Sequence, residues 1–385
     1  MANRDVYARR RRRALAACAG LSGLAGVIVG AGAGEDHSPS PPLPPPTVCD
    51  RTGPAATALI AGQRVMVRME SRAVRPLLAQ ARRGEIGGVI LFPPADIEAD
   101  RLAAQIERVQ AAAREGGNPP LLVAIDQEGG IVERLPALAP QLSPVALAEQ
   151  DRAARARREG SAGGLQLRGL GINVNLAPVM DVPSSEAQFM APRAFGDNPA
   201  KVARLALAFA TGQRSESLAS TAKHFPGLGR ALESTDLAPT TIDAPRSALI
   251  SDMEPFRAAS EAGSELIMLS SAAYPGLGSG ATPAVLSPAI AGELLREDLG
   301  FQGVSISDDL LAPAIALSYS PREAAIRAAA AGVDILLFAA QGAEGVARAL
   351  REARASGRIA EEDMRASCAR ILALKESLSV SEPSP

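Results

Sequence analysis

Short runs of hydrophobic residues alternate along this chain with longer stretches in which hydrophobic and polar residues recur at helical spacing. We interpret the short runs as buried strands and the longer stretches as amphipathic helices. The predicted strands are residues 65–67, 88–92, 121–125, 172–176, 219–222, 266–269, 304–306 and 333–338. The predicted helices are residues 72–83, 98–113, 146–167, 199–216, 245–262, 321–331, 342–355 and 361–378.

The eight strand and helix units follow one another without a break in composition. This pattern predicts an α/β fold with one domain, a single (β/α)8 barrel of the TIM type. A doubly wound open sheet is the alternative. No G-x-G-x-x-G follows the first predicted strand, and the chain has no G-x-x-x-x-G-K-[ST]. The sequence therefore predicts neither a dinucleotide site nor a P-loop, and we expect no cofactor.

Polar side chains follow five of the predicted strands. They are Asp126 and Glu128 after the third, Asp181 after the fourth, Lys223 and His224 after the fifth, Ser270 and Ser271 after the sixth, and Asp308 and Asp309 after the seventh. In a barrel the carboxyl ends of all strands meet on one face, so these groups should converge. Any one of these residues could be explained as a helix cap or as a buried polar group with hydrogen-bond partners. A cluster of buried charges is different, because it needs oppositely charged partners or a ligand.

The stretch F-Q-G-V-S-I-S-D-D-L, from Phe301 to Leu310, carries the candidate nucleophile. Its β-branched run suits a buried strand, and Asp308 lies just past the end of that strand. We therefore take Asp308 as the nucleophile. The alternative is that Asp308 caps the following helix, a role that Asp often fills.

The composition of the chain indicates which classes of ligand it can bind. The chain of 385 residues is 47% hydrophobic with a net charge of −2, so it can bury one large core or two ordinary ones, and it has no Trp. A nucleic-acid partner is not indicated, because basic residues are not concentrated outside the N-terminus and aromatic residues for base stacking are scarce. The sequence has no cluster of His and Cys residues of the kind that binds a metal ion, so we predict no metal site. Carboxylates together with Lys, His and Arg suit a polyhydroxylated ligand such as a sugar, held by charged hydrogen bonds.

The N-terminus indicates export. Arginines 9–13 precede about twenty small or apolar residues, so residues 1–34 read as a signal peptide or a signal anchor. Residues 35–48 form a Pro- and Ser-rich spacer, 49–378 the barrel, and 379–385 a flexible tail. We expect a protein that is secreted or anchored to the outer face of the cytoplasmic membrane. No protein partner is indicated.

Two cysteines remain beyond the predicted leader, Cys49 and Cys368, one at each end of the folded region. Disulfides persist outside the cytoplasm. The first and last elements of a closed barrel are neighbours, so we predict that these two cysteines are joined. Two free thiols are the alternative.

Five motifs resemble those of glycoside hydrolase family 3, and more closely its bacterial β-N-acetylglucosaminidases. In chain order they are A-I-D-Q-E-G-G-I-V-E-R-L from Ala124, N-L-A-P-V-M-D-V from Asn175, P-R-A-F-G from Pro192, K-H-F-P-G from Lys223 and the stretch from Phe301. The resemblance spans residues 62–375, and the family's form with one barrel agrees with the eight strands counted above.

The resemblance implies roles for the matching residues. Asp308 would be the nucleophile that forms a covalent glycosyl-enzyme. The residues that would hold the sugar hydroxyls and the N-acetyl group are Asp126, Arg134, Arg193, Lys223 and His224. Glu128 and Asp181 would either support these residues or be purely structural.

One departure from the family concerns the acid/base. In the acetylglucosaminidases a mobile loop after K-H-F-P-G carries an Asp-x-His pair, which aligns here with Ser234 and Asp236 if the loop has no insertion. Only His37 and His224 occur in the chain, so the sequence predicts that the pair is absent. Asp236 or Glu233 would then supply the proton. The family also usually has His at the position of Ser271 and Arg at that of Ile131.

Three hypotheses remain. The first is a retaining β-N-acetylhexosaminidase acting on N-acetylglucosamine-containing glycans, such as those of the cell wall. The second is a family 3 hydrolase with slow activity or another specificity, such as that of a β-glucosidase. The third is a catalytically impaired, sugar-binding barrel at the cell surface, since fold alone does not fix function.

Overall fold

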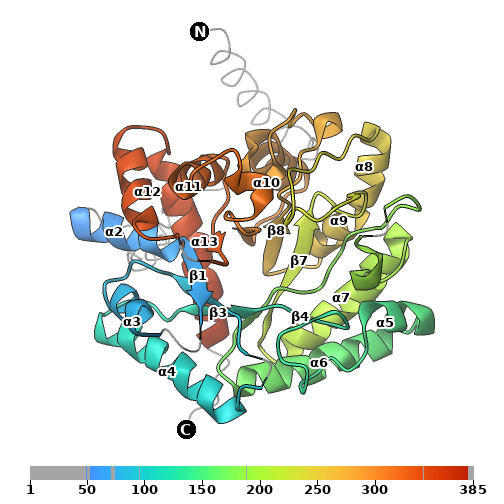
Figure 1. Ribbon diagram of the computed structural model, residues 1–385, viewed down its shortest axis with the longest axis horizontal. Coiled ribbons are helices and arrows are strands. Elements are labelled where there is room, and N and C mark those ends of the chain that lie inside the picture. The colour runs from blue at the N-terminus through green and yellow to red at the C-terminus, as the bar shows by residue number, and fades with distance from the viewer. Residues whose placement is uncertain are drawn as a thin grey trace, which may run out of the picture. The chain divides into compact units, whose positions relative to one another are not determined.

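Eight short parallel strands form one sheet in the computed structural model, which describes residues 49, 53–70, 74–94, 96–187, 189–340 and 342–379. They are β1 (Val65–Met69), β2 (Gly88–Leu91), β3 (Leu122–Ile125), β6 (Val174–Asn175), β7 (Ala219–Phe225), β8 (Leu266–Leu269), β9 (Val304–Ser307) and β10 (Leu336–Phe338). Their order is β10-β1-β2-β3-β6-β7-β8-β9. A parallel bridge between Ile306 and Ile335 joins the two ends of this order, so the predicted (β/α)8 barrel is confirmed (Figure 1).

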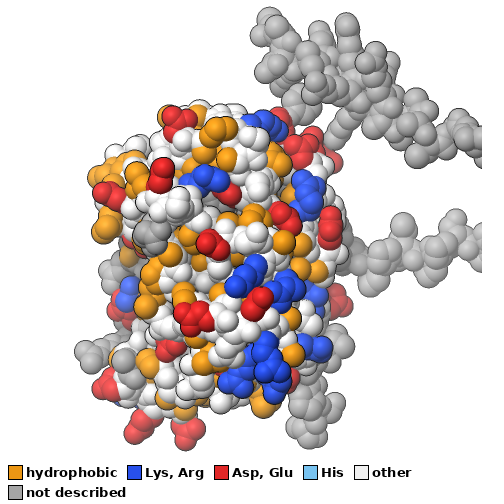
Figure 2. All heavy atoms as spheres, turned by 90° about the vertical axis from the view of Figure 1, so that its right-hand side faces the viewer, with side chains coloured by type: hydrophobic (Ala, Val, Ile, Leu, Met, Phe, Trp, Pro, Cys, Tyr) orange, Lys and Arg blue, Asp and Glu red, His pale blue; other side chains and the backbone are white. Residues whose placement is uncertain are grey.

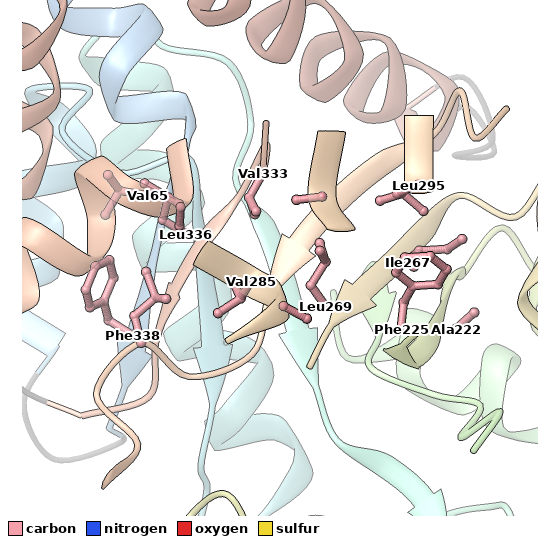
Figure 3. Packing of buried hydrophobic residues seen from close by; sticks show 14 of the residues in the cluster. Val65, Ala222, Phe225, Ile267, Leu269, Val285, Leu295, Val333, Leu336 and Phe338 are labelled. Atoms are coloured by element: carbon pink, nitrogen blue, oxygen red, sulfur yellow. The ribbon is translucent and has the colours of Figure 1, made fainter. Parts of the chain in front are cut away.

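Side chains alternate between the inside and the outside of the barrel. Met66, Ile90 and Leu122 belong to an inner cluster that has residues from all eight strands. Their neighbours in sequence pack instead against the surrounding helices. Figure 3 shows part of this outer cluster, with Leu336 of β10 beside Val65 of β1. Because the strands are buried on both sides, they appear in the sequence as continuous hydrophobic runs.

Helices surround the barrel (Figure 1). They are α2 (Pro54–Gln63), α3 (Val74–Arg82), α4 (Ala99–Glu115), α5 (Pro144–Gln150), α6 (Ala153–Gly169), α7 (Pro199–Ser215), α8 (Arg246–Asp252), α9 (Glu254–Glu261), the π-helix η5 (Pro288–Asp298), α10 (Pro313–Ala316), α11 (Pro321–Ala330), α12 (Val346–Ala355) and α13 (Glu361–Ser379). On the face drawn in Figure 2, acidic and basic side chains are interspersed with hydrophobic ones.

Two predicted helices are each divided in the structure. The helix predicted at 146–167 consists of α5 and α6, because Asp151 adopts a left-handed conformation with φ 51° that ends α5. The helix predicted at 245–262 consists of α8 and α9. Pro255 lies in the first turn of α9 and has no backbone N–H to continue the hydrogen bonds of α8. The helices α2, α10 and η5 were not predicted.

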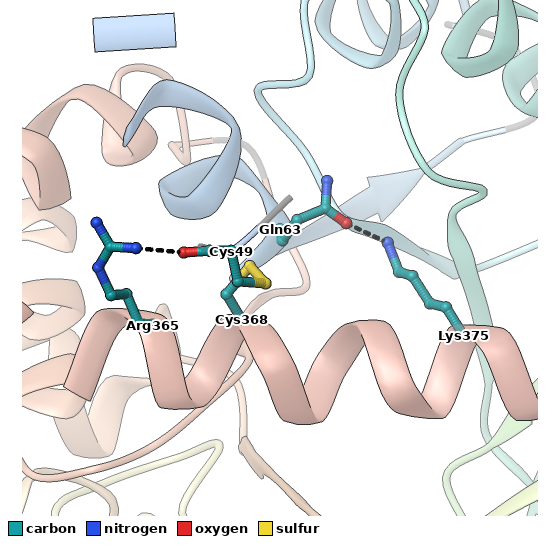
Figure 4. The surroundings of a disulfide bond; sticks show 5 residues. All are labelled: Cys49, Gln63, Arg365, Cys368 and Lys375. Carbon is teal, nitrogen blue, oxygen red and sulfur yellow. Dashed lines mark hydrogen bonds between the residues drawn. A yellow bond between two sulfur atoms is a disulfide. The ribbon is translucent and has the colours of Figure 1, made fainter. Parts of the chain in front are cut away.

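The last helix, α13, closes the amino-terminal end of the barrel. Ile371, Leu374 and Leu378 belong to the inner cluster of the barrel. Lys375 donates a hydrogen bond of 2.5 Å to Gln63, which lies just before β1. Because this end is filled, a ligand can approach the barrel interior only from the opposite face. Figure 4 shows Gln63 and Lys375 beside α13.

Cys49 and Cys368 form a disulfide bond in the structure, with their Cα atoms 5.8 Å apart. It links the segment before α2 to α13. Arg365 strengthens the same link, because its guanidinium donates a hydrogen bond of 2.7 Å to the carbonyl oxygen of Cys49 (Figure 4).

The predicted leader (1–34), the spacer (35–48) and most of the predicted tail lie outside the described residues; Ser379 still belongs to α13. The chain divides into two units, Met1–Pro45 and Pro46–Pro385, and all the described residues belong to the second. Among these residues, no helix combines the length and the hydrophobicity needed to cross a bilayer.

Candidate active site

A cavity of about 340 Å³ opens at the carboxyl ends of the barrel strands. Nine of the residues singled out in the sequence line it: Asp126, Glu128, Arg134, Arg193, Lys223, His224, Asp236, Asp308 and Asp309. They come from segments that lie far apart in the sequence, and the barrel brings them together at the strand ends. Three other polar residues predicted to converge there, Asp181, Ser270 and Ser271, do not line the cavity.

A small hairpin places the first of these residues. Asp126 directly follows β3, and the chain then forms the antiparallel strands β4 (Gln127–Gly129) and β5 (Val132–Glu133). Gly129 and Gly130 have φ values of 95° and 73°, which glycine adopts without strain in the turn between the two strands. The hairpin thereby presents Glu128 to the cavity.

Lys223, Arg193 and Glu128 form a buried charged cluster at the cavity floor. The Nζ atom of Lys223 lies 2.6 Å from Oε1 of Glu128 and 2.8 Å from Oδ1 of Asp126. Arg193, in the short 3₁₀ helix η2 (Ala191–Arg193), donates two hydrogen bonds of 2.9 and 2.7 Å to the carboxylate of Glu128. Such bidentate contacts fix the plane of the guanidinium.

The charges in this cluster keep one another ionised. Burial alone would raise the pKa of Glu128, but the charges of Lys223 and Arg193 hold it at about 2. Burial alone would lower the pKa of Lys223, but Asp126 and Glu128 raise it above its ordinary value. The cluster therefore presents fixed, charged hydrogen-bonding groups at neutral pH.

Arg134 and Phe92 lie next to this cluster. Nη2 of Arg134 is 3.8 Å from Oδ2 of Asp126. The guanidinium carbons of Arg134 and Arg68 are 4.6 and 4.4 Å from the centre of the Phe92 ring, so cation–π contacts hold this ring at the cavity wall.

Asp181 orients His224 from behind the cavity. Its Oδ2 lies 2.7 Å from Nδ1 of His224, and its Oδ1 accepts hydrogen bonds from the backbone N–H groups of His224 and Leu228. A carboxylate on Nδ1 makes that nitrogen the donor, so Nε2 is the imidazole atom that can accept a hydrogen bond. Asp181 does not itself line the cavity.

Backbone groups orient Asp308 and Asp309 at the end of β9. Oδ1 of Asp308 accepts a hydrogen bond of 2.8 Å from the backbone N–H of Asp309. Oδ1 of Asp309 accepts two of 3.0 Å from the N–H groups of Leu311 and Ala339. Burial raises the pKa of Asp309. Asp308 is thus held facing the cavity without capping a regular helix.

Asp236 reaches the cavity from the long loop after β7. Partial burial, and then the negative charge of Asp308, raise its pKa. The loop is fixed at two points: Arg230 donates hydrogen bonds of 2.6 and 3.2 Å to Asp252 of α8, and the carbonyl of Thr235 accepts one of 3.1 Å from Ala314 of α10. Glu233, on the same loop, is exposed and does not line the cavity.

Several cavity residues were not identified from the sequence as part of the site. They are Phe92, Val132, Phe189, Ser234 and Thr235. Phe92 ends the second predicted strand, so applying the strand-end argument to aromatic residues would have found it. Phe189 lies in a stretch without periodicity, which gave no signal. Among the described residues, no group of three or more His, Cys, Asp or Glu side chains is suited to a metal ion.

Comparison with known proteins shows relatives over most of the chain. An uncharacterized secreted glycosyl hydrolase of Arthroderma benhamiae is 34% identical over 338 residues, which are 84% of this chain and 94% of the relative. The structure of a glycoside hydrolase family 3 β-N-acetylglucosaminidase from Paenibacillus superposes with a TM-score of 0.81 at 32% identity, covering 85% of this chain and 64% of that one. The structure of a β-N-acetylhexosaminidase from Beutenbergia cavernae superposes with a TM-score of 0.77 at 32% identity. That superposition covers 83% of this chain and 98% of the Beutenbergia chain.

The chain thus spans less than two thirds of the Paenibacillus enzyme but nearly all of the other two relatives. The family model described as the glycosyl hydrolase family 3 N-terminal domain matches residues 61–374. This match covers all eight strands of the barrel and every residue described in the cavity. The chain therefore belongs to glycoside hydrolase family 3.

Proposed function

We propose that this protein is a retaining β-N-acetylhexosaminidase that hydrolyses N-acetylglucosamine-containing glycans through a covalent intermediate on Asp308. The observation that carries the proposal is the meeting of Asp308 and Asp236 in one cavity with the charged cluster of Glu128, Lys223 and Arg193. The two solved relatives named above, a β-N-acetylglucosaminidase and a β-N-acetylhexosaminidase, support the choice of sugar.

In the first step, a carboxylate oxygen of Asp308 attacks the anomeric carbon and the bond to the leaving-group oxygen breaks. That oxygen takes the proton of Asp236, so the leaving group departs as a neutral alcohol. In the second step Asp236, now a carboxylate, removes a proton from water, and the water oxygen displaces Asp308 from the anomeric carbon. The enzyme returns to its starting protonation state.

Asp236 suits the role of acid/base better than Glu233. A general acid must keep its proton near the working pH and must reach the reacting oxygen. The pKa of Asp236 is shifted upward, the direction that a general acid needs, and Asp236 lines the cavity in which the sugar would lie. Glu233 is exposed as Asp236 is, but it does not line the cavity, so it is the weaker candidate.

The remaining charged residues bind and orient the sugar. We assign Asp126, Arg134, Arg193, Lys223 and His224 to its hydroxyl and N-acetyl groups, because these side chains line the cavity with charged donors and acceptors. Glu128 would hold Arg193 and Lys223 in place, and Asp181 would orient His224. These two carboxylates then support the site without touching the sugar.

We also propose that the protein is exported. The relative from Arthroderma benhamiae is described as secreted, the first 34 residues have the composition of a leader, and Cys49 and Cys368 are bonded in the structure. Whether the leader is cleaved or kept as an anchor is decided by cell fractionation with N-terminal sequencing. Finding the full-length protein only in the cytoplasm would exclude export.

The activity is tested by hydrolysis of aryl β-N-acetylglucosaminide and aryl β-glucoside by the purified barrel. We expect cleavage of the first substrate, with release of the β-anomer seen by NMR at early times. Preferred cleavage of the glucoside would indicate another specificity within family 3. Sugar binding without cleavage of either substrate would identify a catalytically impaired binding protein.

A further inference from the structure

Asp236 lies in an exposed part of the loop that follows β7. Residues 232, 233, 236 and 237 of this loop are exposed, whereas residues 228, 229 and 231 near its start are buried. An exposed segment has few contacts of its own to fix it. The position of Asp236 in the cavity therefore depends on how the rest of the loop is attached to the barrel.

Backbone contacts attach the start of the loop. The N–H of Leu228 donates a hydrogen bond of 2.6 Å to Asp181, and the carbonyl oxygen of Gly229 accepts one of 3.1 Å from the N–H of Ser184. The two backbones touch here, since a Cβ atom at Gly229 would lie 2.0 Å from the carbonyl oxygen of Val182. These contacts fix the chain only as far as Gly229.

Arg230 attaches the next position of the loop through its side chain. Its Nε and Nη2 atoms donate hydrogen bonds of 2.6 and 3.2 Å to the two carboxylate oxygens of Asp252, the last residue of α8. The two side chains are 31% and 7% exposed. A bidentate contact in such a partly buried place fixes its partners more firmly than a surface ion pair does. No other side chain of residues 228–236, all of which the structure describes, forms an ion pair.

A compact turn surrounds Asp236 itself. The hydroxyl oxygen of Ser234 accepts a hydrogen bond of 3.1 Å from the N–H of Asp236, and its carbonyl oxygen accepts one of 3.0 Å from the N–H of Leu237. The carbonyl oxygen of Thr235 accepts one of 3.1 Å from the N–H of Ala314. The turn is thus joined to α10 by one backbone hydrogen bond, and a second attachment nearby is needed to fix its place.

We infer that Arg230 is a positioning residue for Asp236, because its ion pair with Asp252 fixes the loop between the backbone contacts at its start and the turn. The inference rests on the proposed function, in which Asp236 is the acid/base. Arg230 does not line the cavity, so it acts through the loop and not on the sugar. An acid must stay within hydrogen-bonding distance of the leaving-group oxygen, and a displacement of about 1 Å can cost a factor of about 10² in rate.

The test compares phenyl and dinitrophenyl N-acetyl-β-glucosaminides, whose leaving groups are poor and good. For both compounds kcat/KM reports the first step. In Arg230→Met we expect kcat/KM to fall by about 10- to 100-fold for the phenyl compound, which needs the proton, and to stay close to the wild type for the dinitrophenyl compound. Arg230→Lys keeps the charge without the bidentate contact, so it should recover part of the loss.

Two controls separate this role from a general loss of folding. Arg214→Met breaks an ion pair of similar burial, with side chains 39% and 17% exposed, and should leave both kcat/KM values unchanged. Its partner Glu265 directly precedes β8 and so lies at the opposite end of the barrel from the cavity. The double variant Arg230→Met with Asp252→Asn leaves no buried carboxylate unpaired, and it should show the same loss as Arg230→Met.

The Asp236→Ala background shows whether Arg230 acts through Asp236. Because the acid is already absent there, Arg230→Met should have no further effect on the phenyl compound. A further loss in this background would overturn the inference. So would an equal loss for both compounds, or wild-type kinetics, in Arg230→Met alone.

Hydrogen exchange tests the attachment of the loop without turnover. The N–H groups of Leu237 and of Ala314, which donates to Thr235, should exchange faster in Arg230→Met than in the wild type, but not in Arg214→Met. If the wild type cleaves neither compound, the proposed function fails, while faster exchange still supports the hold of Arg230 on the loop. Unchanged exchange at both groups would overturn the inference whatever the activity.

Discussion

The two carboxylates at the proposed reaction centre differ in what surrounds them. Asp308 is fixed by a backbone N–H at the end of a barrel strand, whereas Asp236 lies on a loop next to another negative charge. A nucleophile needs a fixed position, and an acid needs a retained proton. The environments of Asp308 and Asp236 therefore match the roles that we propose for them.

Replacement of Asp236 by Ala should slow the cleavage of poor leaving groups by about 10²- to 10⁴-fold, because these depend most on a proton. Activated aryl glycosides should be affected far less, and azide should restore the second step. In the wild type, activity should fall as pH rises through the pKa of Asp236, since the acid must be protonated. Steady-state kinetics across a pH series gives all three results.

Glu233→Ala is the matched control for this prediction, because Glu233 lies on the same loop but outside the cavity. It should behave like the wild type on every substrate. If Glu233→Ala loses activity while Asp236→Ala keeps wild-type activity, then Glu233 and not Asp236 is the general acid. Normal activity in both variants would place the acid elsewhere.

Replacement of Glu128 by Gln should lower the free energy of unfolding by about 3–5 kcal/mol, because it leaves the buried Lys223 and Arg193 short of negative charge. The pKa of Glu128 is depressed in the folded state to about 2. Its contribution is therefore present above the ordinary glutamate pKa and is lost as pH falls toward 2. Urea denaturation between pH 3 and 7 should show a smaller loss of stability toward acid pH in Glu128→Gln than in the wild type. A variant as stable as the wild type at pH 7 would contradict this account.

At the residue scale, the sequence identifies those cavity groups whose chemistry is distinctive and which lie at strand ends or in family motifs. Asp126, Lys223 and Asp308 are of this kind, and all three line the cavity. It does not identify Phe189, because an aromatic residue between elements carries no such mark. Nor does it predict the contact between Arg230 and Asp252, which depends on how the loop packs against α8.

At the element scale, α13 carries a buried lysine that the proposed mechanism does not use. Lys375 is 4% exposed and its ammonium group donates to the neutral amide oxygen of Gln63. Burial lowers the pKa of Lys375 from 10.5 to about 7. The helix that closes the barrel therefore bears a group that opposes folding when it is charged.

Replacement of Lys375 by Met should raise the free energy of unfolding at pH 7 by about 2–4 kcal/mol, because a side chain of similar length then needs no charge to be buried. In the wild type the unfolded chain binds more protons between pH 7 and about 10.5, so stability should rise with pH over that range. The variant should lack this rise. Denaturant unfolding at several pH values measures both effects, and a variant less stable than the wild type throughout would contradict the prediction.

The strands are the elements that the sequence predicts best. Each of the eight predicted runs overlaps a strand of the barrel, because burial on both faces leaves a continuous hydrophobic run. Helix ends are predicted less well. The ends at Asp151 and near Pro255 depend on one backbone conformation and one missing N–H, which the helical periodicity does not register.

At the scale of the whole molecule, the barrel gives its two ends different functions. The helix α13 fills the amino-terminal end, and the charged cavity opens at the carboxyl end. Alternation of strands and helices was enough to predict that the polar groups gather at the carboxyl end, because parallel strands bring all their carboxyl ends to one face. It did not predict that α13 fills the other end. The exposure of Leu232 and Leu317 could not be predicted in this way, since it is known only when the loops are placed.

The central claim is the covalent glycosyl-enzyme on Asp308, and its most direct test is labelling by a fluorinated N-acetylglucosaminyl inactivator. After proteolysis, mass spectrometry should find one added sugar on the peptide that contains Asp308, attached to that residue. The Asp308→Asn variant should remain unlabelled and inactive, with a thermal stability close to that of the wild type. Attachment of the sugar to Asp236 or Asp309, or turnover that survives in Asp308→Asn, would contradict the account.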